Sequence, residues 1–466
     1  MYESASVLLQ VLHNAGHEAC FVGEWCLTAV HNEHHPEFPL SIINARIATS
    51  ATPLDILRIF PDADATEAGS YAVRLGFGND RYTVTSYRRP TFVNGRVVFA
   101  RVDTLAEDLA HRAFTVDTLT QLADTPVADA KLTCGDDVCS AVDDIREGVI
   151  RAVGDPVDRL REDPLRVVRA FRLMAELGYT LDPATARAIR DATSLLSTVP
   201  SDRIGVELRR LVRGRSAAAA LQAMADAEVF TATCTSTATG KQIKLLPALN
   251  GITADDLQLF TALTAANCDE HERWAALGHR QGLFDQLEEL VGCMTPEELV
   301  TVRWVHEHAD LPALQTADIQ ASRLALLDAV NDDVRAGGIH LLKKLVLHVS
   351  NAYNAVHSGT KECTERLFFN LCARPYVGTQ LKVLGWDMLM LTSATPGPWM
   401  ANVKRRVLHQ LAVMPNYPEP EEIFKKILPQ AMSEEGIPLD KQHEPTHTYI
   451  LDEFPVFLPE GYTETC

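Results

Sequence analysis

A chain of 466 residues is long enough for three or four domains of ordinary size. Its composition, 46% hydrophobic and 23% charged, is that of a globular protein and excludes a disordered or fibrous chain. The net charge of −19 argues against indiscriminate binding to nucleic acid, although it does not exclude a local basic face.

Several features predict a cytoplasmic protein without membrane contact. No apolar run approaches the roughly 20 residues of a membrane span, and the first residues lack the pattern of a signal peptide. The ten cysteines have no dense, regular spacing, which is typical of reduced intracellular thiols. Cys134 and Cys139 have no partner pair in the sequence, so we expect unlinked thiols there.

The first 130 residues predict a small mixed sheet with helices. Short apolar runs predict strands at 19–22, 42–48, 72–75, 82–87 and 97–102. Thr52, Pro53 and Asp55 have the form of a capping box, which predicts a helix that ends near Pro61.

Beyond about residue 140 the pattern becomes helical, because apolar residues recur every three or four positions. Asp182-Pro183 and Thr295-Pro296 are typical helix starts. Two arginine-rich segments without lysine, 151–172 and 200–216, stand out in an acidic chain. They predict either a local basic surface or solvated helix faces with paired charges.

One group of histidines offers a possible metal site. His31, His34 and His35, together with Glu33, could bind a soft metal ion. We expect a solvated loop there instead, since these residues fill the interval between a turn and a strand.

Two stretches are specific enough to suggest a family. The first runs from Asp108 to Asp117, and the second combines 150–156, 161–172 and 177–183. Together with shorter motifs, they resemble the class II tRNA nucleotidyltransferase and poly(A) polymerase family, in the bacterial branch that adds CCA to tRNA. The shorter motifs are Phe21-Val-Gly23, Ala48-Thr-Ser-Ala-Thr-Pro53, Val84-Thr-Ser-Tyr-Arg88, Asp202-Arg203-Ile204, Leu384-Gly-Trp-Asp387 and Pro396-Gly-Pro-Trp399.

The resemblance implies an α+β fold. A nucleotidyltransferase-type head with a small mixed sheet is expected at 1–135, and an all-helical neck with the nucleotide-recognition helix at 136–215. A helical body is expected at 216–375 and a helical tail at 376–466. The resemblance implies that this tail binds RNA. The head and the neck are expected to enclose a cleft.

The neck carries the residues expected to recognise the nucleotide base. Asp163 and Arg166 are three apart, which predicts one helix face that Arg169 and Arg172 continue. A carboxylate beside a guanidinium matches the amino donor and ring-nitrogen acceptor of cytosine and adenine, and rejects uracil and guanine. The resemblance implies that Arg112 contacts the triphosphate of the nucleotide, because its counterpart in the family does so. It also implies that Gly23 lies in the turn that approaches the phosphates. A further group, Arg203, Arg209, Arg210 and Arg213, is expected to bind RNA if it forms an exposed strip.

The chemical positions depart from the family. Where the resemblance places metal-binding carboxylates, this chain has Asn44, Arg46 and Thr83. A fixed positive charge at position 46 repels a dication. Other departures are Glu24 in the phosphate turn, Leu27-Thr28, His111, Ala113 and Asp117. Asp62-Ala-Asp64 has the spacing of a metal pair, but it follows the capped helix rather than the strand before it.

These departures favour a degenerate tRNA nucleotidyltransferase-like protein. Such a protein retains a frame that binds tRNA or tRNA-like RNA and CTP or ATP, and it needs no cofactor. It serves as an inactive RNA-binding or regulatory paralogue or as the partner of an active paralogue. The main alternative is an active CCA- or A-adding enzyme that uses Mg²⁺ through other acids. The second alternative is a structural interaction protein that binds no nucleotide.

Overall fold

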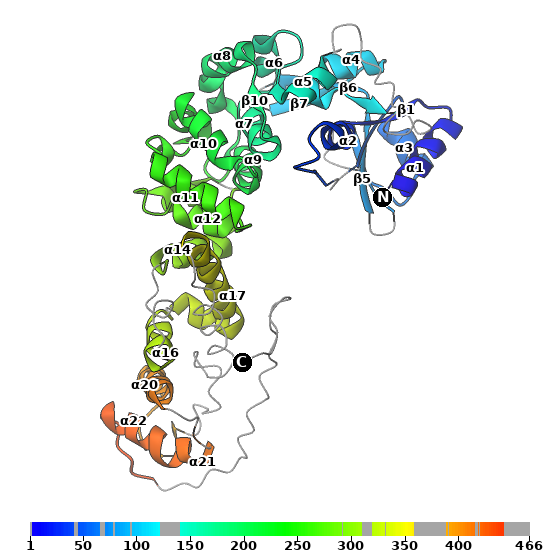
Figure 1. Cartoon of the computed structure of the whole chain (residues 1–466). Helices are drawn as coiled ribbons and strands as arrows, with labels where there is room; N and C mark the ends of the chain where they lie inside the picture. Colours follow the sequence, from blue (N-terminus) through cyan, green and yellow to red (C-terminus); the bar gives the residue numbers. More distant parts are fainter. Residues whose placement is uncertain are drawn as a thin grey trace. The chain divides into compact units, whose positions relative to one another are not determined.

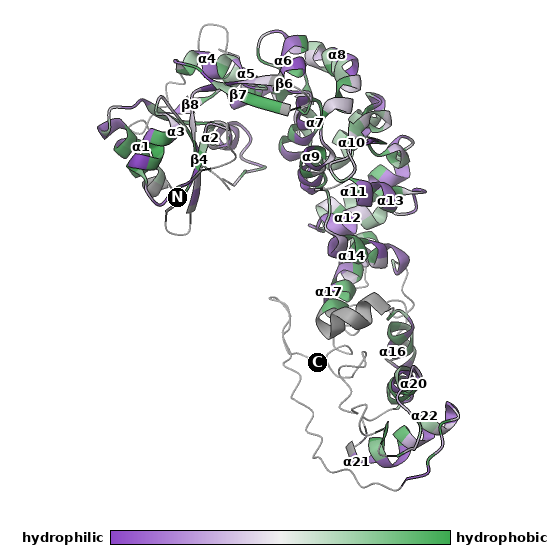
Figure 2. Cartoon of the chain, turned by 180° about the vertical axis from the view of Figure 1, so that it is seen from behind, coloured by the Kyte–Doolittle hydropathy of each residue, from purple (hydrophilic) through white to green (hydrophobic). Residues whose placement is uncertain are grey.

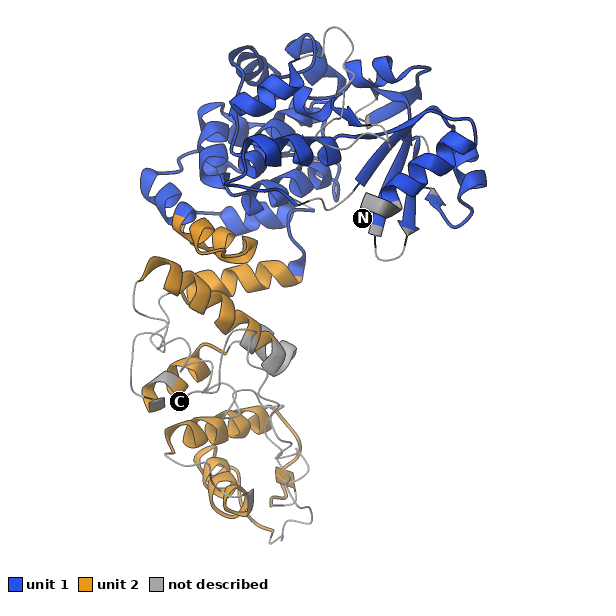
Figure 3. Cartoon of the chain, turned by 45° about the vertical axis from the view of Figure 1, so that its right-hand side comes forward, with its two compact units in different colours: residues 1–261, 280–296 blue, residues 262–279, 297–466 orange. Residues whose placement is uncertain are grey.

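The computed structural model describes residues 2–41, 45–65, 70–77, 80–93, 96–121, 140–290, 292–309, 319–330, 332–357, 388–389, 391–414, 418 and 420–441. The chain forms two compact units (Figure 3). Unit 1 comprises Met1–Thr261 and Arg280–Pro296, and unit 2 comprises Ala262–His279 and Glu297–Cys466. The division into head, neck, body and tail at the expected boundaries stays a prediction.

Unit 1 begins with a mixed sheet, to which β1 and β5 belong (Figure 1). It has six strands in the order β3-β4-β5-β2-β1-β8. Its strands are β1 (Ala19–Val22), β2 (Ala45–Thr49), β3 (Asp64–Ala65), β4 (Ala72–Phe77), β5 (Asp80–Ser86) and β8 (Thr120–Gln121). Only β2 and β5 pair in parallel; the other neighbours are antiparallel. A separate antiparallel ribbon joins β6 (Arg88–Val93) to β7 (Arg96–Arg101).

Short helices accompany this sheet. They are α1 (Tyr2–Asn14), α2 (Glu24–His34), α3 (Pro53–Ile59), α4 (Leu105–Ala110) and the 3-10 turn η1 (Thr115–Asp117). The capping box at Thr52 and Asp55 is confirmed: the Thr52 hydroxyl accepts the N–H of Asp55, and the Asp55 carboxylate accepts the N–H of Thr52. The expected α+β fold is confirmed, with the mixed sheet first and helices after it.

The rest of unit 1 is mainly helical. Its elements are α5 (Ala141–Glu147), β9 (Val149–Ile150), α6 (Pro156–Glu162), α7 (Arg166–Leu177), β10 (Thr180–Leu181), α8 (Pro183–Ala192), η3 (Thr193–Thr198), α9 (Ser201–Arg213), α10 (Ala217–Asp226), η4 (Val229–Thr231), β11 (Thr233–Thr235), β12 (Gln242–Lys244), η5 (Pro247–Leu249), α11 (Ala254–Ala265, which extends into unit 2) and α13 (Leu283–Glu289). The expected helix start at Asp182-Pro183 is confirmed, since Asp182 caps α8.

Helices α7 and α9 pack closely, and both combine hydrophilic and hydrophobic residues (Figure 2). Their apolar residues, such as Val168, Phe171, Leu208 and Leu211, are buried. At the end of α9, a Cβ added to Gly214 would lie 2.5 Å from the carbonyl carbon of Ala175. Only glycine permits that approach, so this contact helps to fix α9 against α7.

The regular elements in the described part of unit 2 are all helices. It contains α12 (Glu270–Ala276), α14 (Pro296–Glu307), α16 (Ile319–Asp328), α17 (Asp332–Val356), α20 (Trp399–Val413), α21 (Pro420–Glu422), the π-helix η7 (Ile423–Ile427) and α22 (Leu428–Glu434). Among the described residues, no helix combines the length and the apolar character that a membrane crossing requires.

The expectation of a solvated histidine loop is wrong. His31 and His34 belong to α2, and His31 is fully buried. The Nδ1 atom of His31 lies 2.7 Å from the hydroxyl of Tyr179, and its Nε2 lies 3.0 Å from the carbonyl oxygen of Phe38. His31 therefore packs this helix against a distant part of unit 1. Cys134, Cys139 and the motif at 384–387 lie outside the described residues.

Candidate functional site

A cavity of about 850 Å³ opens in unit 1 between the sheet and helices α7 and α9. All six residues that the sequence assigned to nucleotide binding line it: Gly23, Arg112, Asp163, Arg166, Arg169 and Arg172. Residues from β2, β4, β5, the β6–β7 ribbon, α4 and η1 complete the wall. The expected convergence of these side chains is therefore present, whereas their binding role stays a prediction.

The lining is strongly positive. Nine arginines face four acidic residues: Arg46, Arg74, Arg88, Arg112, Arg166, Arg169, Arg172, Arg203 and Arg210 against Asp108, Asp117, Asp163 and Glu207. The lining thus carries an excess of five positive charges in a protein whose net charge is −19. Low-dielectric walls lined by one sign of charge concentrate oppositely charged ligands. The cavity is suited to a polyanion.

Three neighbouring strands build the sheet side of the cavity. Strand register places Arg46 opposite Thr83, and Thr83 opposite Arg74. Paired residues in adjacent strands point to the same face, so these three side chains form one row. Two guanidinium groups therefore flank the hydroxyl of Thr83.

Asp64 lies on the same row of side chains, but it is too far from Arg46 to supply a metal-binding carboxylate there. It pairs with Arg74 on the sheet's outer strand, three strand spacings from Arg46. At about 4.8 Å per strand, the separation is roughly 14 Å. Asp64 is exposed and does not line the cavity. Asp62 and Asp64 therefore do not replace carboxylates on β2.

Near the β6–β7 ribbon, the carboxylate of Asp108 accepts hydrogen bonds from Arg112 and Arg88. Its Oδ2 accepts the Nε–H of Arg112 at 2.9 Å, and its Oδ1 accepts the backbone N–H of Arg88 at 3.0 Å. The Arg88 guanidinium stacks 4.0 Å from the centre of the Phe99 ring. Burial lowers the pKa of Arg88 to about 10, and the Asp108 charge opposes that shift. Asp108 is thus engaged in holding arginines towards the cavity.

The expectation that Asp163 and Arg166 share one helix face is wrong. Helix α6 ends at Glu162 and α7 begins at Arg166, so Asp163 lies in the turn between them. Pro164 explains the break, because a residue before proline avoids helical backbone angles. The Oδ1 atom of Asp163 accepts the N–H of Leu165 at 3.3 Å.

Asp163 also lies near the guanidinium group of Arg203, a residue that the sequence predicted to bind RNA. The Nη2 atom of Arg203 lies 3.5 Å from Oδ2 of Asp163, and the Nη1 atom of Arg169 lies 3.9 Å from it. Arg166 instead donates to the carbonyl oxygens of Arg159 and His111, each at 2.8 Å. The donor beside Asp163 is therefore Arg203 rather than Arg166.

Glu207 of α9 bridges two arginines of α7. Its Oε1 lies 3.0 Å from Nε of Arg169, and its Oε2 lies 2.7 Å from Nε of Arg172. Although burial alone would raise it, these two guanidinium groups hold the pKa of Glu207 below its usual value. Sequence reasoning missed this bridge, because the partners lie more than 30 residues apart.

The four arginines predicted to bind RNA do not form one exposed strip. Arg203 and Arg210 line the cavity, and Arg210 pairs with Glu176 at 2.9 Å. Arg209 is half-buried and Arg213 is exposed. Positions 203 and 210 are seven apart and share a helix face, whereas Arg209 and Arg213 do not line the cavity. Two of the four arginines therefore belong to the cavity and two do not.

Comparisons with known proteins agree with this architecture. A family model described as "Probable RNA and SrmB- binding site of polymerase A" matches residues 178–233. The CCA-adding enzyme of Bacillus subtilis (strain 168) is 33% identical over 235 residues, 49% of this chain and 55% of that enzyme. That alignment thus spans about half the length of the curated relative. The CCA-adding enzyme of Bacillus velezensis is 26% identical over 430 residues, 87% of this chain and 92% of that enzyme.

Solved structures extend the likeness to the fold of nearly the whole chain. The Bacillus stearothermophilus CCA-adding enzyme in complex with CTP has a TM-score of 0.71 at 24% identity, covering 93% of this chain and 98% of that one. The Thermotoga maritima CCA-adding enzyme complexed with tRNA has a TM-score of 0.53 at 16% identity, covering 91% and 94%. By sequence and by fold, the chain is thus similar to bacterial CCA-adding enzymes, which supports the tRNA nucleotidyltransferase family.

The described residues do not fit the pair of metal ions that this family implies. Of the three positions where the resemblance places carboxylates, Asn44 lies outside the described residues, and the other two are Arg46 and Thr83. Each cavity carboxylate lies beside an arginine; Asp117, for example, acts electrostatically on Arg46, Arg112 and Arg169. Within the described part of the chain, the groups of three potential metal ligands belong to unit 2, and none of their residues lines this cavity.

The phosphate turn of the family is also altered. Gly23 precedes α2 with a φ of +65°, a conformation that favours glycine, and the next residue is Glu24. Burial raises the pKa of Glu24, and the charges of Arg210 and Arg46 oppose that rise. A carboxylate at this point repels the phosphates of a nucleotide, and its burial makes its ionisation costly.

Glu24→Gln is expected to raise the melting temperature at pH 7. A carboxyl whose pKa is raised in the folded state stabilises the fold below its unfolded pKa, about 4.5, and loses that contribution as the pH rises through the folded value. The advantage of the glutamine variant should therefore appear as the pH rises above 4.5 and vanish below it. Thermal melts across this range measure it, with the exposed Glu33→Gln on the same helix as the control. A parent that melts above the variant at pH 7 would contradict the expectation.

Proposed function

We propose that this protein binds a nucleotide and tRNA-like RNA but does not catalyse metal-dependent nucleotide transfer. It would then act as an RNA-binding or regulatory paralogue in the cytoplasm. The observation that carries the proposal is Arg46, which puts a fixed positive charge in the cavity where the resemblance places a metal-binding carboxylate. In such a site, guanidinium groups rather than metal ions neutralise the phosphates.

Support for nucleotide binding comes from the cavity. Its arginines offer rigid, permanently charged donors suited to phosphate oxygens. Asp163 and Arg203 offer an acceptor beside a donor, the pattern that matches the amino group and ring nitrogen of cytosine or adenine. The related Bacillus stearothermophilus enzyme is described in complex with CTP, and the Thermotoga maritima enzyme with tRNA. We extend both ligand classes to this chain.

Two other functions make different predictions. An active CCA- or A-adding enzyme would require Mg²⁺ held by acidic residues at other positions, because Arg46 and Thr83 are not acids. The fold shared with the Bacillus stearothermophilus enzyme is consistent with this alternative. A structural interaction protein would leave the cavity without a nucleotide. The binding experiment below separates the proposal from the structural alternative, and the transfer assay in the Discussion separates it from the enzyme.

CTP and ATP are expected to bind more tightly than UTP and GTP, by about tenfold, because one matched donor–acceptor pair is worth about 1–3 kcal/mol. Isothermal titration of the four nucleotides in EDTA measures this preference. Asp163→Asn should abolish it, because the amide keeps an oxygen for the N–H of Leu165 but presents a donor where the base needs an acceptor.

The matched control is Asp158→Asn, since Asp158 is exposed on α6 and does not line the cavity. It should retain the preference. Equal affinities for all four nucleotides in the parent would contradict base recognition by Asp163. No binding of any nucleotide would favour the structural alternative.

A further inference from the structure

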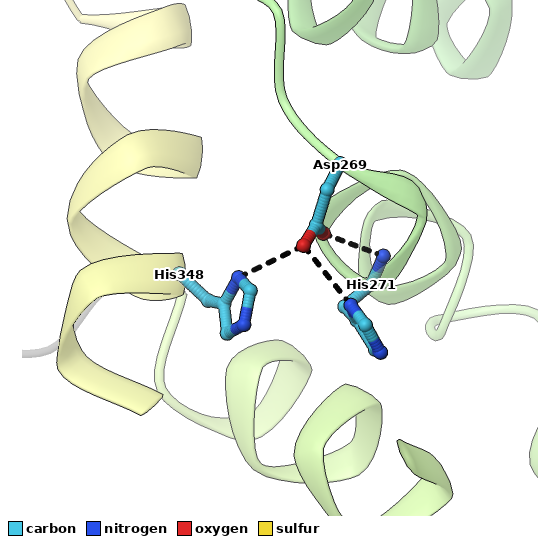
Figure 4. Close-up of side chains that lie close together, drawn as sticks. All are labelled: Asp269, His271 and His348. Carbon is cyan, nitrogen blue, oxygen red and sulfur yellow. Dashed lines mark hydrogen bonds and ion pairs between the residues drawn. The ribbon is translucent and has the colours of Figure 1, made fainter. Parts of the chain in front are cut away.

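Unit 2 contains a cluster of two histidines and a carboxylate that the nucleotide cavity does not use. Asp269 precedes α12, His271 lies in its first turn, and His348 lies on α17 (Figure 4). Helices α12 and α17 pack against each other. One ligand atom from each of the three residues lies within 4.8 Å of the other two. Segments some 80 residues apart thus bring three potential metal ligands together.

The carboxylate of Asp269 points towards both imidazoles (Figure 4). Its Oδ2 lies 3.1 Å from Nδ1 of His271 and 3.6 Å from Nδ1 of His348. In a tetrahedral zinc site with bonds of about 2.0–2.1 Å, neighbouring ligand atoms are about 3.3 Å apart. These two distances lie on either side of that value, and the two imidazoles offer ligand atoms within 4.8 Å of each other. The three atoms are therefore close enough for a single ion to draw them together.

The helix cap orients the carboxylate. The Oδ1 atom of Asp269 accepts the backbone N–H groups of His271 at 2.8 Å and Glu272 at 3.4 Å. This leaves Oδ2 for the imidazoles. The orientation of a ligand by hydrogen bonds to its other atoms is typical of metal sites in proteins.

The surroundings also suit a divalent cation. His271 and His348 are buried, at 9% and 7% exposure, and their Nε2 atoms make no hydrogen bond among the described residues. The Nε2 atom of His271 lies 3.9 Å from a carboxylate oxygen of Glu298, which is too far for a hydrogen bond but adds negative charge near the cluster. Glu272 adds a second, fully buried carboxylate, whose Oε1 is 2.7 Å from Nδ1 of His348. An ion that binds Nδ1 would take the place of the proton between these two atoms, and that proton would be released to solvent. An ion of charge +2 would balance Asp269 and Glu272 together.

We propose that Asp269, His271 and His348 bind one divalent transition-metal ion, Zn²⁺, which fastens α12 to α17. Two imidazoles and a carboxylate favour zinc over Mg²⁺, which prefers oxygen ligands alone. Asp269 is 47% exposed, so the ion has a path from solvent and water can complete its coordination. This proposal is independent of the function proposed for unit 1.

The test uses the full chain without an affinity tag, stripped with EDTA and titrated with Zn²⁺ against a competing chelator. About one ion per chain should bind, and excess Zn²⁺ should raise the melting temperature by about 5 °C. Co²⁺ in place of Zn²⁺ should give the visible absorption of a tetrahedral site, a readout that requires no variant. A parent that binds no Zn²⁺ in this titration would overturn the proposal.

Two variants locate the ion. Asp269→Asn preserves the helix cap, because asparagine caps as well as aspartate, but removes the anionic ligand. His348→Gln removes an imidazole from α17. Each should lower the affinity for Zn²⁺ by about tenfold or more. The control is His308→Gln, because His308 stacks on Trp304 outside the cluster. Unchanged affinity in Asp269→Asn and His348→Gln would place the ion elsewhere and overturn the proposal.

Discussion

The purified protein is expected to add no CMP or AMP to tRNA that lacks its CCA end when Mg²⁺ or Mn²⁺ and all four nucleoside triphosphates are present. Two-metal catalysis of phosphoryl transfer activates the primer hydroxyl and neutralises the developing charge on the triphosphate. Neither Arg46 nor Thr83 has a carboxylate that could hold a metal ion, and the positive charge of Arg46 repels one. Loss of several kcal/mol of stabilisation corresponds to a rate at least about a thousandfold lower.

The Bacillus subtilis CCA-adding enzyme serves as the positive control. Extension of the tRNA by labelled nucleotides, resolved by gel, is the readout. Incorporation at a rate similar to the control would support the active alternative, provided that Arg112→Ala abolishes it and a contaminant is thereby excluded. Arg112 lines the cavity and is held by Asp108.

Glu207→Leu is expected to destabilise the fold by about 3–5 kcal/mol, the usual cost of removing one partner of a buried ion pair. The substitution leaves the guanidinium groups of Arg169 and Arg172 in a buried region without the carboxylate that bridges them. Unfolding by urea, followed by circular dichroism, measures the change.

Asp143→Leu is the matched control, because Asp143 forms an ion pair with Arg146 whose two side chains are 62% and 56% exposed. Exposed pairs contribute about 0–1 kcal/mol. Similar small losses in both variants would mean that the bridge between α7 and α9 adds little stability, contrary to its burial.

Much of the fold follows from local signals in the sequence. The capping box at Thr52 and the proline starts at Pro183 and Pro296 predicted helices that the structure contains. Strand β6 was not predicted, because Arg88, Arg89 and Pro90 do not form a typical strand pattern. Proline is tolerated there because the β6–β7 ribbon has only two strands, both of them edges.

The site was predicted less completely, because residues that are in contact there lie far apart in the sequence. The motifs identified the residues that line the cavity, but the partners of those residues come from elsewhere. Glu207 meets Arg169 and Arg172 only because α9 packs on α7, and Arg74 joins Arg46 only through strand register. The break before Arg166 could have been found, since Pro164 signals it locally.

The measurement that tests the central claim most directly is the affinity for CTP with and without metal. Isothermal titration in EDTA and in excess Mg²⁺ should give dissociation constants within about threefold of each other, because the nine arginines that line the cavity can neutralise a triphosphate without metal. Replacing Arg46 with alanine should lower the affinity for CTP in both buffers. Binding that appears only with Mg²⁺, or tightens by about tenfold or more with it, would contradict a cavity that recognises nucleotides without metal.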